Sequence, residues 1–207
     1  MFGNEKKLKD KRIAILATDG FEESELFEPR KALMDAGAQI DVISIRPGII
    51  VGWKNDEWSR EIAVDLPIED AVADDYDAIL LPGGVINADR LRREQKAVEF
   101  LEGFLDSGKP VAAICHAPWI LIETGAIMGR TLTSWPSLKT DLFNAGANWV
   151  DEVVHVDNGL VTSRKPNDIP AFNQKMIEEF SKGPHHVTHA ANRPRKNDDK
   201  GLVDRLF

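Results

Sequence analysis

The chain has only one cysteine, Cys115, in 207 residues. A single thiol excludes an internal disulfide framework and fits a reducing compartment. No apolar run approaches the roughly 20 residues that a membrane-spanning helix needs, and residues 1–10 hold no apolar core of signal-peptide length. We therefore expect a soluble, cytoplasmic protein with no membrane partner.

A surplus of positive charge is also missing, because 34 Asp and Glu residues outnumber 26 Lys and Arg residues. Nucleic-acid binding calls for a basic face that meets the phosphates. The formal net charge of −8 therefore argues against nucleic acid as the main partner. Repeats and low-complexity stretches are absent as well, and the chain length suits one α/β domain with a buried core.

Short apolar runs alternate with helical stretches over residues 11–182. Strands are predicted at 12–17, 39–45, 77–81, 110–114, 152–157 and 159–163, and helices at 24–36, 94–107, 118–122, 137–144 and 170–181. This alternation is typical of an α/β, doubly wound, mostly parallel sheet with helices on both faces. Ligands of such sheets bind at the carboxyl ends of the strands.

Two segments of the chain favour hairpins, and the last residues differ in composition from the rest of the chain. Residues 48–68 predict a short hairpin excursion, and Asn158-Gly159 predicts a tight hairpin turn. Residues 183–207 are rich in Asn, Asp, Arg and Lys, and we interpret them as a C-terminal extension.

Cys115 ends the apolar run Val111–Ile114 and is followed by His116 and, two residues later, Pro118. Pro118 suits the first position of a helix, so Cys115 is expected on a tight strand-to-helix turn, the geometry of a nucleophile elbow. The positive end of that helix favours the thiolate and a lowered thiol pKa. A lone cysteine is by default a buried structural residue. The elbow position and the adjacent histidine favour a nucleophile instead.

Four carboxylates follow the first predicted strand: Glu22, Glu23, Glu25 and Glu28. The helix dipole favours acidic residues at a helix start, which accounts for Glu23 and Glu28. Glu22 and Glu25 are three residues apart and can share a face at the sheet edge of Cys115, so one of them is expected to reach the sulfur. A desolvated carboxyl there has a raised pKa and donates a hydrogen bond while protonated.

The turn Pro82–Gly84 ends another strand at the same edge. Its glycines allow a close backbone approach, and its amides together with that of His116 would form an oxyanion hole. The same residues also suit a simple turn.

His116 is the general acid or base by residue type. As the neighbour of Cys115 on a helix start, it is expected to point away from the sulfur and to need a third group that aims its ring. Asp89 is the candidate for that role, from the same chain or from a partner subunit. His155 and the histidines of the extension lack cysteine or clustered acidic partners, so no metal site is predicted.

Five motifs, taken in order, resemble the PfpI-type proteins of the class I glutamine-amidotransferase-like superfamily. They are Phe21-Glu22-x-x-Glu25-Leu26-x-x-Pro29, Leu81-Pro82-Gly83-Gly84, Asn87-Ala88-Asp89-x-Leu91-Arg92, Ala113-Ile114-Cys115-His116 and Thr162-Ser163-Arg164-x-Pro166-x-Asp168-x-Pro170. Ala117 and Lys165 stand where glycine is common in the family, and Asp89 stands where some members have glutamate.

The resemblance implies a flavodoxin-like fold in which Cys115 is the nucleophile, Glu25 is hydrogen-bonded to it and His116 is its partner. An acidic residue of an adjacent subunit, here Asp89, orients the histidine. Gly84 and His116 supply the oxyanion amides, and we place Gly83 and Glu22 beside them in the substrate site. No cofactor is implied, and the expected assembly is a homodimer or a hexamer built from dimers.

Members of the family are described as intracellular peptidases, stress proteins, glyoxalases and deglycases. One mechanism covers these activities, because a thiolate attacks a carbonyl whose oxyanion is held by amides. We expect a stress-related cysteine hydrolase acting on small carbonyl compounds, glycated adducts or peptides. The alternative is a redox-sensing or chaperone-like protein in which Cys115 is oxidised and Glu25 stabilises the sulfinate. An enzyme would need His116 and Asp89, whereas a sensor would need only Cys115 and Glu25.

Overall fold

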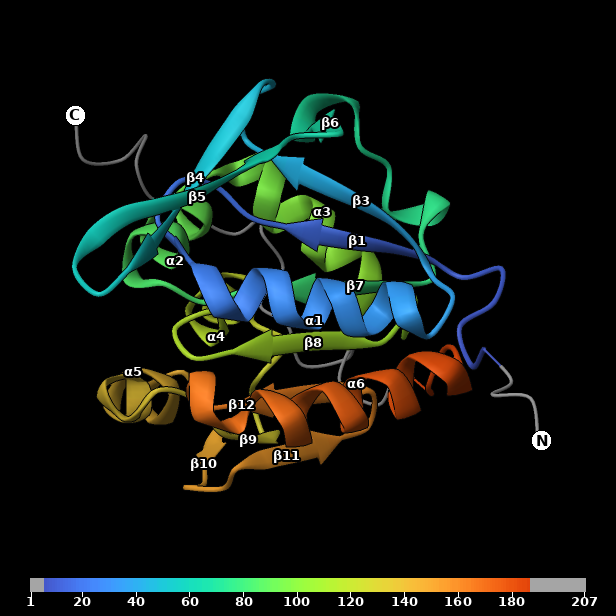
Figure 1. Cartoon of the computed structure of the whole chain (residues 1–207). Helices are drawn as coiled ribbons and strands as arrows, with labels where there is room; N and C mark the ends of the chain where they lie inside the picture. Colours follow the sequence, from blue (N-terminus) through green and yellow to red (C-terminus); the bar gives the residue numbers. More distant parts are fainter. Residues whose placement is uncertain (1–5, 187–207) are drawn as a thin grey trace, which may run out of the picture.

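The computed structural model describes residues 6–186, which form a seven-stranded sheet between two layers of helices (Figure 1). The strand order is β11-β12-β8-β7-β1-β3-β6. All neighbours run parallel except β11, which is antiparallel to β12. The strands are β1 (Arg12–Leu16), β3 (Gln39–Ser44), β6 (Leu66–Pro67), β7 (Ala78–Leu81), β8 (Val111–Ile114), β11 (Val154–Asp157) and β12 (Leu160–Ser163). The predicted flavodoxin-like, mostly parallel sheet is confirmed.

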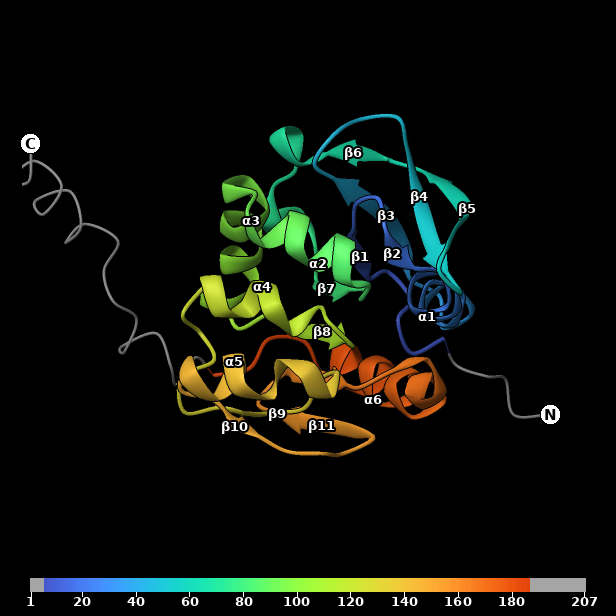
Figure 2. The same ribbon diagram turned by 90° about the vertical axis from the view of Figure 1, so that its left-hand side faces the viewer.

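Helices cover both faces of this sheet, as the view along the strands in Figure 2 shows. One layer holds α1 (Glu23–Asp35) and α6 (Ile169–Lys182), and the other holds α2 (Val85–Arg92), α3 (Gln95–Asp106) and α4 (Pro118–Glu123). Strand β1 sends Ile13 and Ile15 into the core under α1 and α6, and it sends Ala14 and Leu16 into the opposite core. Strands buried on both faces read as continuous apolar runs, which is why the sequence predicts them well.

Short elements complete the fold at the sheet margins. The predicted hairpin is β4 (Ile49–Lys54) with β5 (Glu57–Ala63), and β2 (Phe21–Glu22) pairs with β4 to make a three-stranded sheet. The remaining elements are β9 (Thr131–Leu132), β10 (Asn148–Trp149), α5 (Lys139–Asn144) and the 3-10 turns Ile68–Asp70, Ala73–Asp75, Pro136–Leu138 and Pro166–Asp168. Within residues 6–186, no helix has the length and apolar character needed to cross a membrane.

Both hairpin turns depend on left-handed backbone. Asn158 and Gly159 have φ values of +43° and +83° between β11 and β12, and Asn55 and Asp56 have +50° and +64° between β4 and β5. Positive φ at both central residues is the geometry that matches the twist of the flanking strands. The hairpin predicted at Asn158-Gly159 is therefore confirmed.

One α-helix, α2, is not among the helices that the sequence predicts. Only Asn87, Ala88 and Leu91 of this eight-residue helix are buried. One of the three is polar, so the apolar periodicity that identifies a helix is weak.

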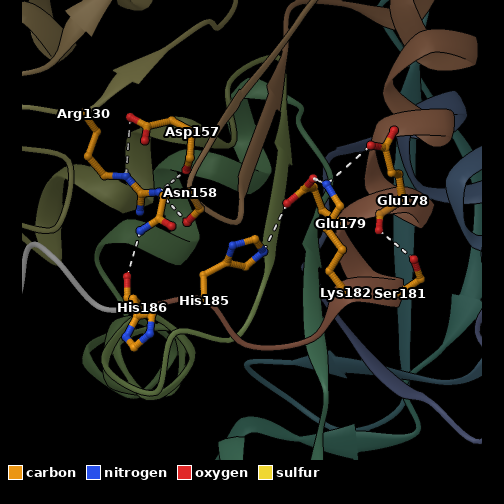
Figure 3. Close-up of polar contacts among 9 residues, drawn as sticks. All are labelled: Arg130, Asp157, Asn158, Glu178, Glu179, Ser181, Lys182, His185 and His186. Atoms are coloured by element: carbon orange, nitrogen blue, oxygen red, sulfur yellow. Dashed lines mark hydrogen bonds and ion pairs between the residues drawn. The ribbon is translucent and has the colours of Figure 1, made fainter.

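After α6 the chain turns back over the β11–β12 hairpin (Figure 3). The backbone N–H of His185 donates to the carbonyl of Gly108 at 2.8 Å, and Asn158 Nδ2 donates to the carbonyl of His186 at 2.8 Å. The His185 ring lies 3.1 Å from Oε2 of the buried Glu179, which also pairs with Lys182. The start of the predicted extension is thus anchored to the domain; residues 187–207 lie outside the described residues.

The aromatic core provides a test of this fold. Phe104 on α3 is fully buried and packs edge-to-face against Phe100, with the two ring centroids 5.2 Å apart. Phe143 on α5 is 70% exposed. We expect Phe104→Ala to lower the free energy of unfolding by about 3–5 kcal/mol. The matched control Phe143→Ala should change it by about 0.5 kcal/mol or less. Urea unfolding followed by circular dichroism measures both, and equal losses would contradict this placement of the core.

Candidate active site

Cys115 directly follows strand β8 and lies in a strained turn, and α4 begins three residues later at Pro118. Cys115 has a φ of +63°, a left-handed conformation that costs free energy for a residue with a β-carbon. Its N–H donates to the carbonyl of Ser163 at 3.0 Å, and its carbonyl accepts from the N–H of Trp135 at 2.9 Å. These two hydrogen bonds hold the turn from both sides. The local geometry is that of a nucleophile elbow.

Glu25, in the first turn of α1, is the carboxyl that contacts the Cys115 thiol, and Glu22 is not. The side chain is fully buried, and its Oε2 accepts a hydrogen bond from the N–H of Gly83 at 3.1 Å. Burial raises the pKa of Glu25 well above its ordinary value, and the nearby charge of Glu22 raises it further. Burial therefore favours the protonated form of Glu25, which can donate a hydrogen bond to the sulfur.

Two backbone amides, those of Gly84 and His116, donate to the same sulfur. Burial raises the pKa of Cys115, ionisation of Glu25 would raise it further, and the two amides act in the opposite direction. The expectation that the helix start gives this thiol a lowered pKa is wrong. Helix α4 has only six residues, so its dipole is weak beside the effect of burial.

The ring of His116 folds back toward Cys115, which corrects the expectation that it points away. Its Nδ1 lies 3.2 Å from Sγ of Cys115, and its Nε2 lies 3.4 Å from Oγ of Ser137. The ring stacks on Trp135 with centroids 5.8 Å apart. The left-handed backbone at Cys115 reverses the chain direction, which lets two adjacent side chains converge. Burial lowers the pKa of His116 to about 4, so the resting ring is neutral and its nitrogen can accept a hydrogen bond from the thiol.

Asp89 does not reach His116 within one chain. It lies on the exposed side of α2, and among residues 6–186 its side chain makes no hydrogen bond or ion pair. Trp135 and Ser137 are the side chains that hold the His116 ring instead. A contact of Asp89 with a histidine across a subunit interface stays a prediction.

The two glycines after Pro82 pack directly against the elbow. A β-carbon at Gly83 would lie 2.3 Å from Oε2 of Glu25 and 2.6 Å from Cβ of Cys115. At Gly84, with a φ of +92°, it would lie 2.3 Å from the carbonyl oxygen of Gly20. Only glycine fits at either position. The Gly83 amide is engaged by Glu25, so the amides that face the sulfur are those of Gly84 and His116 rather than all three.

Asn87 was missed by the sequence analysis as a site residue although it secures this glycine turn. Its fully buried side chain accepts from the N–H of Thr18 at 2.8 Å and donates to the carbonyls of Pro82 at 2.9 Å and Gly83 at 3.1 Å. It therefore ties the end of β1 to the end of β7. An amide side chain has both the donors and the acceptor that this link needs.

A pocket of about 540 Å³ opens above the sulfur. Besides the elbow and the glycine turn, it is lined by Glu22, Trp53, Asp56, Ile86, Trp135 and Pro166. Glu22 is half-buried, and burial raises its pKa. Trp53 and Asp56 come from the β4–β5 hairpin, and no signal in the sequence connects that hairpin with Cys115. Among the described residues, no three His, Cys, Asp or Glu side chains are grouped to hold a metal ion.

Comparison with known proteins agrees with this geometry. The sequence profile of the DJ-1/PfpI family matches residues 11–179. General stress protein 18 of Bacillus subtilis (strain 168) is 43% identical over 173 residues, which cover 83% of this chain and 99% of that protein. Protein/nucleic acid deglycase 2 of Escherichia coli (strain K12) is 42% identical over 168 residues, with coverages of 81% and 96%.

A solved structure supports the same assignment. The crystal structure of Drosophila melanogaster DJ-1beta superposes with a TM-score of 0.75 at 29% identity, covering 83% of this chain and 90% of that one. The matched residues include the strands, the glycine turn and the elbow that build the site. The chain therefore belongs to the DJ-1/PfpI family.

Proposed function

We propose that this protein is a stress-related cysteine hydrolase that attacks small reactive carbonyl compounds or their adducts on amines. The observation that carries the proposal is the 3.2 Å approach of His116 Nδ1 to the Cys115 sulfur, inside a pocket that Glu25 also enters. A nucleophile needs a base within hydrogen-bond reach. The names General stress protein 18 and Protein/nucleic acid deglycase 2, borne by two relatives, support this reading.

Each group has a role in the proposed reaction. The neutral His116 ring takes the thiol proton, and the Cys115 thiolate adds to the carbonyl carbon of the substrate. The oxygen that becomes negative accepts hydrogen bonds from the amides of Gly84 and His116. Protonated Glu25 donates to the sulfur and stabilises it as an anion. For a substrate with an amine on its carbonyl carbon, the tetrahedral adduct collapses, the carbon–nitrogen bond breaks, and His116 gives the proton to the departing amine. The acyl group is left as a thioester on Cys115. Water, which gives a proton to His116, adds to this thioester, and collapse releases the acid and restores the thiol.

The pocket favours small substrates. Its volume of about 540 Å³ matches a small molecule or a single modified side chain rather than an extended peptide. Trp53 and Trp135 provide apolar walls, and Glu22 and Asp56 add acidic ones. Substrates with an apolar body and a neutral or cationic end suit these walls.

A redox sensor is the second candidate, because Glu25 is a buried, protonated carboxyl in contact with Cys115, the sole thiol in the chain. Such a carboxyl can donate a hydrogen bond to a sulfinate. A sensor does not need His116 or Asp89, so variants of these residues separate the two functions.

Turnover of methylglyoxal, glycated amines and fluorogenic peptides tests the proposed function. We expect Cys115→Ser to lower kcat/KM by a factor of at least about 10³, and His116→Gln to lower it by about 10²–10⁴. His155→Gln is the matched control, since His155 lies on β11 and pairs with Glu152. It should leave turnover unchanged. Full activity of Cys115→Ser would overturn the proposal. If the wild type turns over none of these substrates but peroxide oxidises its Cys115, the result would favour the sensor.

Alkylation of Cys115 by iodoacetamide at neutral pH reports the contribution of Glu25. Because Glu25 is a protonated donor, Glu25→Ala should slow alkylation by about tenfold, while Glu25→Gln, which keeps a neutral donor, should slow it less. The control Glu22→Gln should react at nearly the wild-type rate. Faster alkylation of Glu25→Gln than of the wild type would show that Glu25 is ionised at this pH, contrary to the assignment.

We further propose that the active unit is a homodimer or a hexamer of dimers in which Asp89 of one subunit orients His116 of the other. Subunits carrying Cys115→Ser and Asp89→Asn, each inactive alone, are mixed at equal amounts. Half of the resulting dimers pair the two variants and have one restored site of two, so about a quarter of wild-type activity should return. No recovery despite verified subunit exchange, or a fully active monomer in sedimentation, would exclude this role.

A further inference from the structure

A second pocket, of about 610 Å³, lies at the same edge of the sheet as Cys115 but shares no lining residue with the first. It is formed by the chain after β1 (Thr18, Asp19), the chain after β3 (Ile45–Pro47), the start of β4 and the end of α2. In Figure 1 the arrowheads of β1 and β3 both point to the left side of the molecule, where α2 also lies. The carboxyl ends of strands are where doubly wound sheets bind ligands. Nothing in the proposed reaction uses this pocket.

Positive charge gathers in this pocket although the chain carries a formal net charge of −8. Three arginines line it: Arg46, Arg90 and Arg93. Arg90 lies 3.4 Å from Asp19, whose other oxygen accepts the N–H of Val51 at 2.9 Å. Arg46 and Arg93 are exposed, and within residues 6–186 neither side chain makes an ion pair or a hydrogen bond. Asp19 and Glu94 are the only carboxylates of the lining, so the pocket keeps an excess of positive charge.

A buried hydroxyl without a partner lines the same pocket. Ser44, the last residue of β3, has no exposed surface, and its Oγ makes no hydrogen bond among the described residues. A buried polar atom that lacks a partner costs about 1–3 kcal/mol. A ligand that accepts a hydrogen bond from Ser44 would remove that cost. The hydroxyl and the unpaired arginines are independent observations that favour the same chemistry, an anion rich in acceptor oxygens.

We propose that this pocket binds a small phosphate-bearing molecule, with its phosphate held by Arg46, Arg93 and the Ser44 hydroxyl. The guanidinium group presents paired N–H donors that match phosphate oxygens, and several charged donors around one tetrahedral group suit a dianion better than a planar carboxylate. The volume exceeds that of phosphate alone, so the group belongs to a larger molecule of metabolite size.

Isothermal titration calorimetry on the full chain, at low salt, tests the site with inorganic phosphate and ribose 5-phosphate as probes. We expect saturable binding at one site per chain that weakens with added sodium chloride. Arg46→Gln and Arg93→Gln should each weaken binding by about tenfold. The control Lys31→Gln removes one charge from the far helix α1 and should not change affinity. Cys115→Ser should bind like the wild type, so this result is independent of the proposed reaction.

Ser44→Ala separates ligand binding from stability. Because the hydroxyl has no partner in the free protein, its removal should leave the melting temperature equal or higher while phosphate affinity falls severalfold. A large drop in melting temperature with unchanged affinity would show that Ser44 serves the fold. Absence of saturable binding, equal affinity in the arginine variants, or equal affinity for ribose or for malonate would each overturn the phosphate assignment.

Discussion

The close contact between the Gly83–Gly84 turn and the elbow at Cys115 is the constraint on which the site depends. A β-carbon at Gly83 would overlap both the carboxyl of Glu25 and Cβ of Cys115. Because that carbon is missing, the Gly83 amide can hold Glu25 and the Gly84 amide can face the sulfur. Asn87 keeps the turn in place through three hydrogen bonds to the ends of β1 and β7.

Burial then decides the protonation states at this contact. It raises the pKa of Glu25 and of Cys115 and lowers the pKa of His116 to about 4. Each shift favours the neutral form, since a charge loses its hydration inside the protein. Burial therefore favours an uncharged acid, thiol and imidazole in the resting site, and the proposed reaction creates charge where the amides of Gly84 and His116 are already directed.

The same sheet edge supports two pockets of opposite character. The first has acidic and aromatic walls around Cys115, and the second carries three arginines beyond the ends of β1 and β3. Helix α2 contributes to both, with Val85 and Ile86 at its start facing the first and Arg90 and Arg93 at its end facing the second. A parallel sheet permits this arrangement because every strand ends at one edge, where loops are free to vary.

The sequence by itself determined the alternation of strands and helices, the strand-to-helix turn at Cys115 and the Asn158-Gly159 hairpin. These follow from local rules, namely burial patterns, a proline at a helix start and residues that accept positive φ. Only the tertiary structure decided that His116 folds back to the sulfur, that Asp89 stays in solvent within one chain and that Trp53 and Trp135 flank the pocket. It also reversed the expected direction of the thiol pKa shift. The physical reason is that burial and contact depend on residues far apart in the chain, whereas a sequence pattern reports only its neighbours.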